Sequence, residues 1–255
     1  IEISGGLFST DPSQYVVADK MASAESTTID GITYVYAIGD KVENTATVEA
    51  APDVKVDTTG KEEQVAAAME TVAAALQADD AVKADGLQAV ANTITKDETR
   101  MAEAQTQAAE QFVEENVDTA GKATTIVIEQ YMEIQVTDAV VAGEAVSVTL
   151  DIIPKYNLKA TTADVAAGEE MIEDSAEKNT VTLDSGLTLT VTTPVDITLP
   201  LPAVLADAQA DTLYVQHQKS ASQVYYYKAI VDGTENKTIT FTNPNGFSTF
   251  VLKAD

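Results

Sequence analysis

Cysteine and tryptophan are absent from this chain of 255 residues, and histidine occurs once, at His217. Without cysteine the chain has no disulfide framework, no thiol catalysis and no metal site built on thiolates. This absence does not by itself assign the protein to a compartment. Aromatic residues make up 5% of the sequence and hydrophobic residues 45%, so the apolar residues are mainly Ala, Val, Ile and Leu. We therefore expect cores built largely of small side chains.

Basic residues are also scarce, since 15 Lys and Arg stand against 41 Asp and Glu and leave a formal net charge of −26. Such a charge repels nucleic acids and anionic lipids, and we expect no nucleic-acid partner. No run of about 18 apolar residues is present, so we expect no membrane insertion of this fragment. Because the chain begins with Ile1 rather than Met, we interpret it as a piece of a longer protein.

Motifs of nucleophilic catalysis and nucleotide binding are missing as well. The sequence contains no G-x-S-x-G elbow, no G-x-G-x-x-G turn and no P-loop. His217 shares a strand face with Leu213 and Val215, which is more typical of a histidine at the edge of a core than of a catalytic base. Two carboxylates could in principle serve glycoside hydrolysis, but sequence gives no distance between them. We expect neither enzymatic activity nor a cofactor.

The acidic residues do not form a recognisable metal motif. Asp53, Asp57 and Glu62 lie close together but fail the spacing of an EF-hand loop. A solvated acidic linker explains them better, and we predict no metal site.

In residues 1–43, apolar and polar residues alternate as in short strands, and turn signals such as Asp30–Gly31 separate the strand segments. The text IEISGGLFSTDPSQYVV resembles a repeat found at the end of right-handed parallel β-helix regions in Gram-positive surface proteins. Lys20–Met21 departs from the aspartate-glycine pair that is usual there. The segment is therefore either the last coil of a β-helix or a short β-meander. The matching residues are Ile3, Ser4, Gly5, Gly6, Phe8, Ser9, Asp11, Pro12, Ser13, Tyr15 and Val16.

The chain then changes character twice. Residues 44–60 are polar with Pro52 and Gly60, which indicates a linker or an irregular extended crossing. Residues 61–120 form an acidic segment in which Val65, Met69, Val72 and Leu76 recur at helical spacing. We predict two or three helices there, with breaks near residues 79–80 and 85–86.

Residues 121–255 are predicted to be strands separated by turns, and 163–174 a loop or short helical turn. Seven to nine strands in this length favour an antiparallel, Ig-like β-sandwich, which makes the whole chain an α+β protein. We expect this domain to fold alone. The expected strands are 124–133 or longer, 146–153, 180–183, 187–191, 195–199, 212–218, 224–231, 238–241 and 249–252.

The last seventy residues resemble the C-terminal β-sandwich repeats of Gram-positive surface proteins, in which a similar F-S-T-F text closes the domain. This resemblance implies an extracellular or cell-wall location and says nothing about activity. The matching residues are Phe241, Thr242, Phe247, Ser248, Thr249, Phe250 and Val251.

The run Tyr225–Tyr226–Tyr227 supplies a candidate contact residue. Alternation in a strand sends Tyr225 and Tyr227 to one face and Tyr226 to the other, so Tyr226 is the candidate for ligand binding if the first face is core. The leading hypothesis is a non-catalytic structural or adhesive module of a secreted bacterial surface protein, with a glycan or a host or cell-surface protein as its partner. The alternative is a carbohydrate-binding or accessory tail module of a larger carbohydrate-active enzyme.

Overall fold

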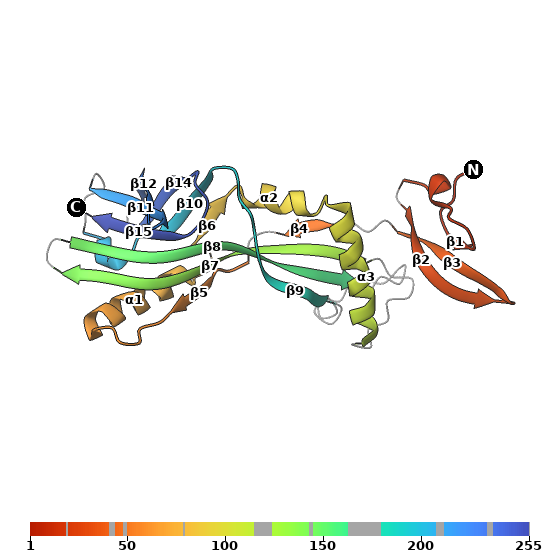
Figure 1. Ribbon diagram of the computed structural model, residues 1–255, viewed down its shortest axis with the longest axis horizontal. Coiled ribbons are helices and arrows are strands. Elements are labelled where there is room, and N and C mark those ends of the chain that lie inside the picture. Colours follow the sequence, from red (N-terminus) through yellow and green to blue (C-terminus); the bar gives the residue numbers. More distant parts are fainter. Residues whose placement is uncertain are drawn as a thin grey trace. The chain divides into compact units, whose positions relative to one another are not determined.

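A computed structural model describes residues 1–18, 20–40, 44–47, 50–78, 80–114, 124–142, 145–162, 180–207, 212–233 and 237–254. The described chain is rich in strands and has three α-helices, which makes it an α+β protein (Figure 1). The helices are α1 (Glu63–Leu76), α2 (Leu87–Ile94) and α3 (Glu98–Glu114). The strands are β1 (Gly6–Phe8), β2 (Lys20–Ile29), β3 (Ile32–Asp40), β4 (Thr45–Thr47), β5 (Asp53–Val56), β6 (Lys83–Asp85), β7 (Thr124–Ala142), β8 (Ala145–Thr162), β9 (Thr180–Thr188), β10 (Val195–Pro200), β11 (Leu213–Ser220), β12 (Gln223–Lys228), β13 (Ile230–Asp232), β14 (Thr238–Asn243) and β15 (Thr249–Ala254).

The chain forms two compact units, each made of three segments. The first unit comprises residues 1–46, 94–128 and 157–185, and the second comprises 47–93, 129–156 and 186–255. The long neighbouring strands β7 and β8 contribute residues to both (Figure 1).

The first unit begins with an antiparallel three-stranded sheet in the order β1-β3-β2. Asp30 and Gly31 join β2 to β3 with φ values of 51° and 79°. Positive φ at both positions is the requirement of a type I′ hairpin, and a loop this short can join only antiparallel strands. The three described strands pair antiparallel with β3 between β1 and β2, and a parallel bridge joins Ile3 to Val16.

Buried side chains of the first unit come from α3 and from the adjoining parts of β7, β8 and β9. Asp97 caps the N-terminus of α3, since its Oδ1 accepts a hydrogen bond from the Arg100 backbone N–H at 3.0 Å. Gln107 on this helix donates through Nε2 to the Leu183 carbonyl at 3.0 Å. The buried apolar residues are Met101, Ala104, Ala108, Phe112, Ile126, Ile128, Leu158, Ala160, Val181 and Leu183.

The second unit has one core shared by two sheets and a helix. One sheet has the order β13-β14-β10-β6, and the other runs β12-β11-β15-β8-β7-β4. Helix α1 buries Met69, Val72 and Leu76, which recur at helical spacing, in the same cluster as Phe241 of β14 and Phe250 of β15. Both sheets and α1 therefore depend on the same buried apolar surface.

The structure differs from the sequence prediction at residues 44–60, which are not simply a linker. Residues 45–47 and 53–56 are strands β4 and β5, and β5 pairs in parallel with β7, placing Val54 opposite Ile134. The Ala50 N–H also donates to the Gln130 carbonyl at 2.8 Å. Polar residues can form a strand here because a distant strand satisfies their backbone groups.

The predicted domain boundary at residue 121 also differs from the structure. Within 61–120 the chain forms the three helices, but residues 83–85 are strand β6, whose buried Ala84 lies opposite Ile197 of β10. Residues 47–93 belong to the same unit as 186–255, so the sheets of 121–255 do not form a separate core.

Several predicted strands have different bounds. Strand β7 extends beyond residue 133, as the prediction allowed, whereas β8 is longer than expected and β9 replaces the strands predicted at 180–183 and 187–191. The predicted strand 224–231 is divided into β12 and β13 at the buried Ala229. Residues 163–174 lie outside the described residues.

Candidate binding face

Strands β11 and β12 form an antiparallel hairpin at one edge of the larger sheet. Because side chains alternate along each strand, the pairing of His217 with Tyr225 and of Val215 with Tyr227 places these residues on one face. This inner face contributes to the core. Tyr226 lies opposite Gln216 on the outer face, as alternation in the Tyr225–Tyr227 run predicts.

The outer face carries two neighbouring tyrosines. Tyr226 is 66% exposed, and its ring centroid lies 6.0 Å from that of Tyr214 with the two planes tilted by 48°. Val224, further along β12, is also exposed. An aromatic ring this exposed leaves apolar area in water that a partner could cover.

Two lysines flank Tyr214 in the register of the sheet. Tyr214 lies opposite Lys228 of β12 on one side and Lys253 of β15 on the other. We define the tyrosine face as the outward side chains Tyr214, Gln216, Tyr226, Lys228 and Lys253. It combines aromatic rings, an amide and two ammonium groups on one continuous sheet surface.

A buried hydrogen-bond network lies on the opposite side of the same strands. His217 is 0% exposed, and its ring stacks on Phe250 with centroids 4.3 Å apart. Its Nδ1 lies 2.9 Å from the Tyr227 hydroxyl and its Nε2 lies 2.8 Å from the Ser248 hydroxyl. Asn245 donates to Tyr227 at 3.0 Å.

This network joins the two sheets of the second unit. Tyr227 belongs to β12, and its hydroxyl lies 3.2 Å from Asn243 Oδ1 of β14. Ser248, which precedes β15, donates to the Gln218 carbonyl of β11 at 3.1 Å. His217 therefore fixes the edge hairpin against the turn that connects β14 to β15.

Ser248, His217 and Tyr227 lie at the separations of a catalytic triad, but their protons are arranged differently. Each hydroxyl has one hydrogen to donate. If Ser248 donates to Gln218, then His217 Nε2 donates to Ser248, and Nδ1 of a neutral ring accepts the one Tyr227 proton, which is then not donated to Asn243. In this tautomer the ring cannot take the serine proton. The Gln218 carbonyl still accepts its hydrogen bond from the Ser248 hydroxyl.

Burial controls the protonation of this group. Burial, with a smaller contribution from the Lys219 ammonium, lowers the pKa of His217 from 6.5 to about 4. Burial also raises the pKa of the Tyr227 phenol. At neutral pH the network is therefore uncharged, as expected of a polar group enclosed by a core.

Two of the three acidic residues considered for a metal have protein partners. Asp53 lies 3.1 Å from Lys55 Nζ, and Asp57 accepts from the Thr59 N–H at 2.9 Å. The hydrogen bond from Lys55 to Glu133, and then that to Asp53, raises the pKa of Lys55. Glu62 stands at the N-cap of α1. Within the part of the chain that is described, no three His, Asp or Glu side chains are grouped as metal ligands would be.

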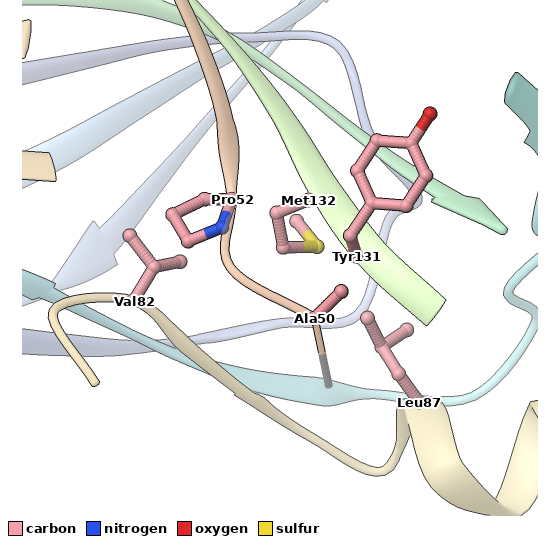
Figure 2. Close-up of a pocket in the computed structure, with 6 residues that line it drawn as sticks. All are labelled: Ala50, Pro52, Val82, Leu87, Tyr131 and Met132. Carbon is pink, nitrogen blue, oxygen red and sulfur yellow. The ribbon is translucent and has the colours of Figure 1, made fainter. Parts of the chain in front are cut away.

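An apolar pocket lies elsewhere in the second unit, between the segment before β5, the region around β6 and strand β7. Figure 2 shows Pro52, Met132 and Ala50 around a common space, with the phenol oxygen of Tyr131 turned away from it. The cavity volume of about 10 Å³ accommodates about one water molecule, far less than a ligand of ordinary size needs. We do not assign this pocket a ligand. Its lining residues are Ala50, Pro52, Val82, Leu87, Tyr131 and Met132.

Sequence reasoning predicted the outward orientation of Tyr226 and the core position of His217 but missed the residues around them. Alternation cannot identify Tyr214 or Lys253 as neighbours, because the order β12-β11-β15 brings them together. The signals available for Ser248 and Asn243 were the F-S-T-F text and the Asn-Pro-Asn-Gly turn.

None of the described helices is long and apolar enough to cross a bilayer. Comparison of the chain with protein families, with curated proteins and with solved structures finds no match in any of the three.

Proposed function

We propose that this chain is a non-catalytic adhesive module of a secreted bacterial surface protein, and that the tyrosine face is its contact surface for a glycan. The observation that carries the proposal is the pair of outward tyrosines, with ring centroids 6.0 Å apart and Tyr226 66% exposed. Tyrosine presents a rigid apolar ring with a polar tip, which suits contact with the C–H faces and hydroxyls of sugars.

The surface location rests on the two resemblances in the sequence. The C-terminal one falls on β14 and β15, where Phe241 and Phe250 pack with ring centroids 5.5 Å apart. We also propose that the two sheets of the second unit form an Ig-like β-sandwich. Their shared core and largely antiparallel pairing support this assignment.

The hydrogen bonding of His217 supports a non-catalytic role. The ring is enclosed, and the Ser248 hydroxyl has a backbone carbonyl within hydrogen-bond distance as an acceptor besides the ring. A serine nucleophile needs a base that accepts its proton. The network instead holds the hairpin that presents Tyr214 and Tyr226.

The same tyrosine face also suits the alternative, a carbohydrate-binding or accessory tail module of a larger carbohydrate-active enzyme. A host or cell-surface protein is the competing kind of partner. The full reading frame separates the two functions, because a catalytic domain in the same chain would select the tail module.

The proposal is tested by screening the chain against a glycan array. Tyr226→Ala should abolish the retained signals, whereas Tyr15→Ala, which removes an exposed tyrosine of the first unit, should leave them unchanged. Bound glycans should yield no new reducing ends on prolonged incubation. No glycan retained, or equal loss in both variants, would reject the tyrosine face as the contact surface. Release of reducing ends would reject the non-catalytic role.

A further inference from the structure

The tyrosine face is positively charged on a chain that is otherwise strongly acidic. The register of β12, β11, β15 and β8 places twelve side chains on the outer side of the sheet in three rows of four, of which Val251 in the middle row is buried. Lys228 and Lys253 are the cations among them, and Asp151 is the one carboxylate. The whole chain has a net charge of −26 over 255 residues, which is about one excess negative charge for every ten residues. The face therefore has the opposite sign to the chain average.

Among the described residues, no carboxylate lies next to this pair of cations in the register. Lys228 and Lys253 lie in the same row as Tyr214, whereas Asp151 lies in the third row opposite Thr249. Four residues along β15 separate these rows by about 13 Å. Asp151 Oδ1 already accepts a hydrogen bond from the Thr249 hydroxyl. Among the ion pairs of the described residues, none involves Lys228 or Lys253.

We propose that the tyrosine face binds a saccharide chain that carries carboxylate groups. Tyr214 and Tyr226 contact the sugar rings, Gln216 bonds to hydroxyls, and the ammonium groups of Lys228 and Lys253 contact carboxylates. This inference rests on the proposed function and specifies the ligand class of the same face.

The geometry favours an extended acidic saccharide over a polymer of phosphates. The two lysines lie two strands apart, about 10 Å, and they are single point charges rather than the forks that grip phosphate. A phosphate chain would leave the two tyrosine rings without a function. Sugar rings use both features, since their C–H faces cover aromatic surface while carboxylates meet the cations.

The experiment compares binding of the full chain to polygalacturonate and to the same polymer with its carboxyl groups methyl-esterified. We expect at least tenfold tighter binding to the charged polymer, and this preference should fall as salt is added. Lys228→Gln and Lys253→Gln should each weaken binding to polygalacturonate two- to fivefold, as for exposed charge pairs, and leave binding to the ester unchanged. Lys83→Gln, on β6 of the other sheet, is the matched control and should behave like the parent chain.

The outcomes separate this inference from the proposed function. Equal binding of both polymers, with loss only in Tyr226→Ala, would overturn the carboxylate assignment while keeping a glycan-binding face. Binding of polyphosphate as tight as that of polygalacturonate, and unaffected by Tyr226→Ala, would overturn the saccharide assignment. Binding of neither polymer by the parent chain would overturn the carboxylate assignment, whereas binding indifferent to Tyr226→Ala would overturn both proposals for this face.

Discussion

At the scale of single residues, His217 links burial, hydrogen bonding and protonation. Its two ring nitrogens bridge the hydroxyls of Ser248 and Tyr227, and Phe250 covers one face of the ring. A neutral imidazole suits this position because it can donate at one nitrogen and accept at the other. Protonation would place a positive charge inside the core, and the Lys219 ammonium would repel that charge. Protonation therefore opposes folding.

The first prediction concerns how stability depends on pH through His217. Above pH 6.5 the ring is neutral in both the folded and the unfolded chain. Between pH 6.5 and about 4 the unfolded chain binds a proton that the folded chain does not. This group then lowers the free energy of unfolding by up to about 1.4 kcal/mol for each pH unit that the pH falls.

Urea unfolding of the parent chain and of His217→Gln at pH 7.5 and pH 4.5 measures this effect. The titrating carboxylates are common to both proteins, so their contributions cancel in the difference. The advantage of the parent over the variant should shrink by about 2–3 kcal/mol at the lower pH. An advantage of the same size at both pH values would show that His217 is readily protonated in the folded chain.

Sequence alone could predict the orientation of single residues but not their partners. Period-2 alternation is a local property, so it predicts that Tyr226 points away from Tyr225 and Tyr227. The ring of His217 bonds to Ser248, which lies 31 residues away, and this contact depends on the fold of the hairpins. The lysine pair has the same origin, because Lys228 and Lys253 meet Tyr214 only through the strand order.

At the scale of elements, β14 follows its sequence pattern closely. Ile239 and Phe241 are buried, and the threonines that alternate with them lie on the opposite face. The turn Asn243–Gly246 reverses the chain, with Gly246 at a φ of 79° that suits glycine. Phe250 is then buried on β15. Local alternation and turn chemistry are enough to predict these two strands and the turn between them, but not their pairing, because β14 and β15 belong to different sheets.

The second prediction compares two adjacent positions on β14. Phe241→Ala removes a ring that is 2% exposed and should lower the free energy of unfolding by about 3–5 kcal/mol. Thr240→Ala removes the hydroxyl contact with Thr198 at 2.8 Å and should cost about 0.5–1.5 kcal/mol. Thermal unfolding followed by circular dichroism measures both. Similar losses in the two variants would mean that the inward face of β14 is assigned wrongly.

The elements that sequence reasoning missed are short strands with distant partners. Lys55 of β5 contacts Glu133 of β7, a separation of 78 residues, and β6 has three residues. Neither segment is long enough for its own pattern to indicate a strand. Their existence depends on the exposed edges of β7 and β10, which become available only when the larger sheets form.

At the scale of the whole molecule, sequence order and compact units do not coincide. Each unit draws on three separate segments of the chain. A change of period at residue 121 correctly indicates a change from helix to strand, but it does not mark a domain boundary. Helix α1 buries Met69, Val72 and Leu76 against the core that contains Phe241, so the sheets are incomplete without residues that precede 121.

The last prediction follows from this shared core. A chain shortened to residues 121–255 lacks α1, β5 and β6, which exposes one side of the core and leaves the edges of β7 and β10 unpaired. The burial of Met69, Val72 and Leu76 alone is worth about 5–9 kcal/mol, which is comparable with the whole stability of a typical domain. The shortened chain should therefore lose its cooperative urea transition in far-ultraviolet circular dichroism. The matched control is residues 47–255, which removes only the segment 1–46, where Pro12 is the one buried residue among those described. This control should keep a cooperative transition near the midpoint of the full chain. If residues 121–255 instead unfold cooperatively at the same midpoint as 47–255, the C-terminal sheets form a complete core of their own and α1 is an accessory to it.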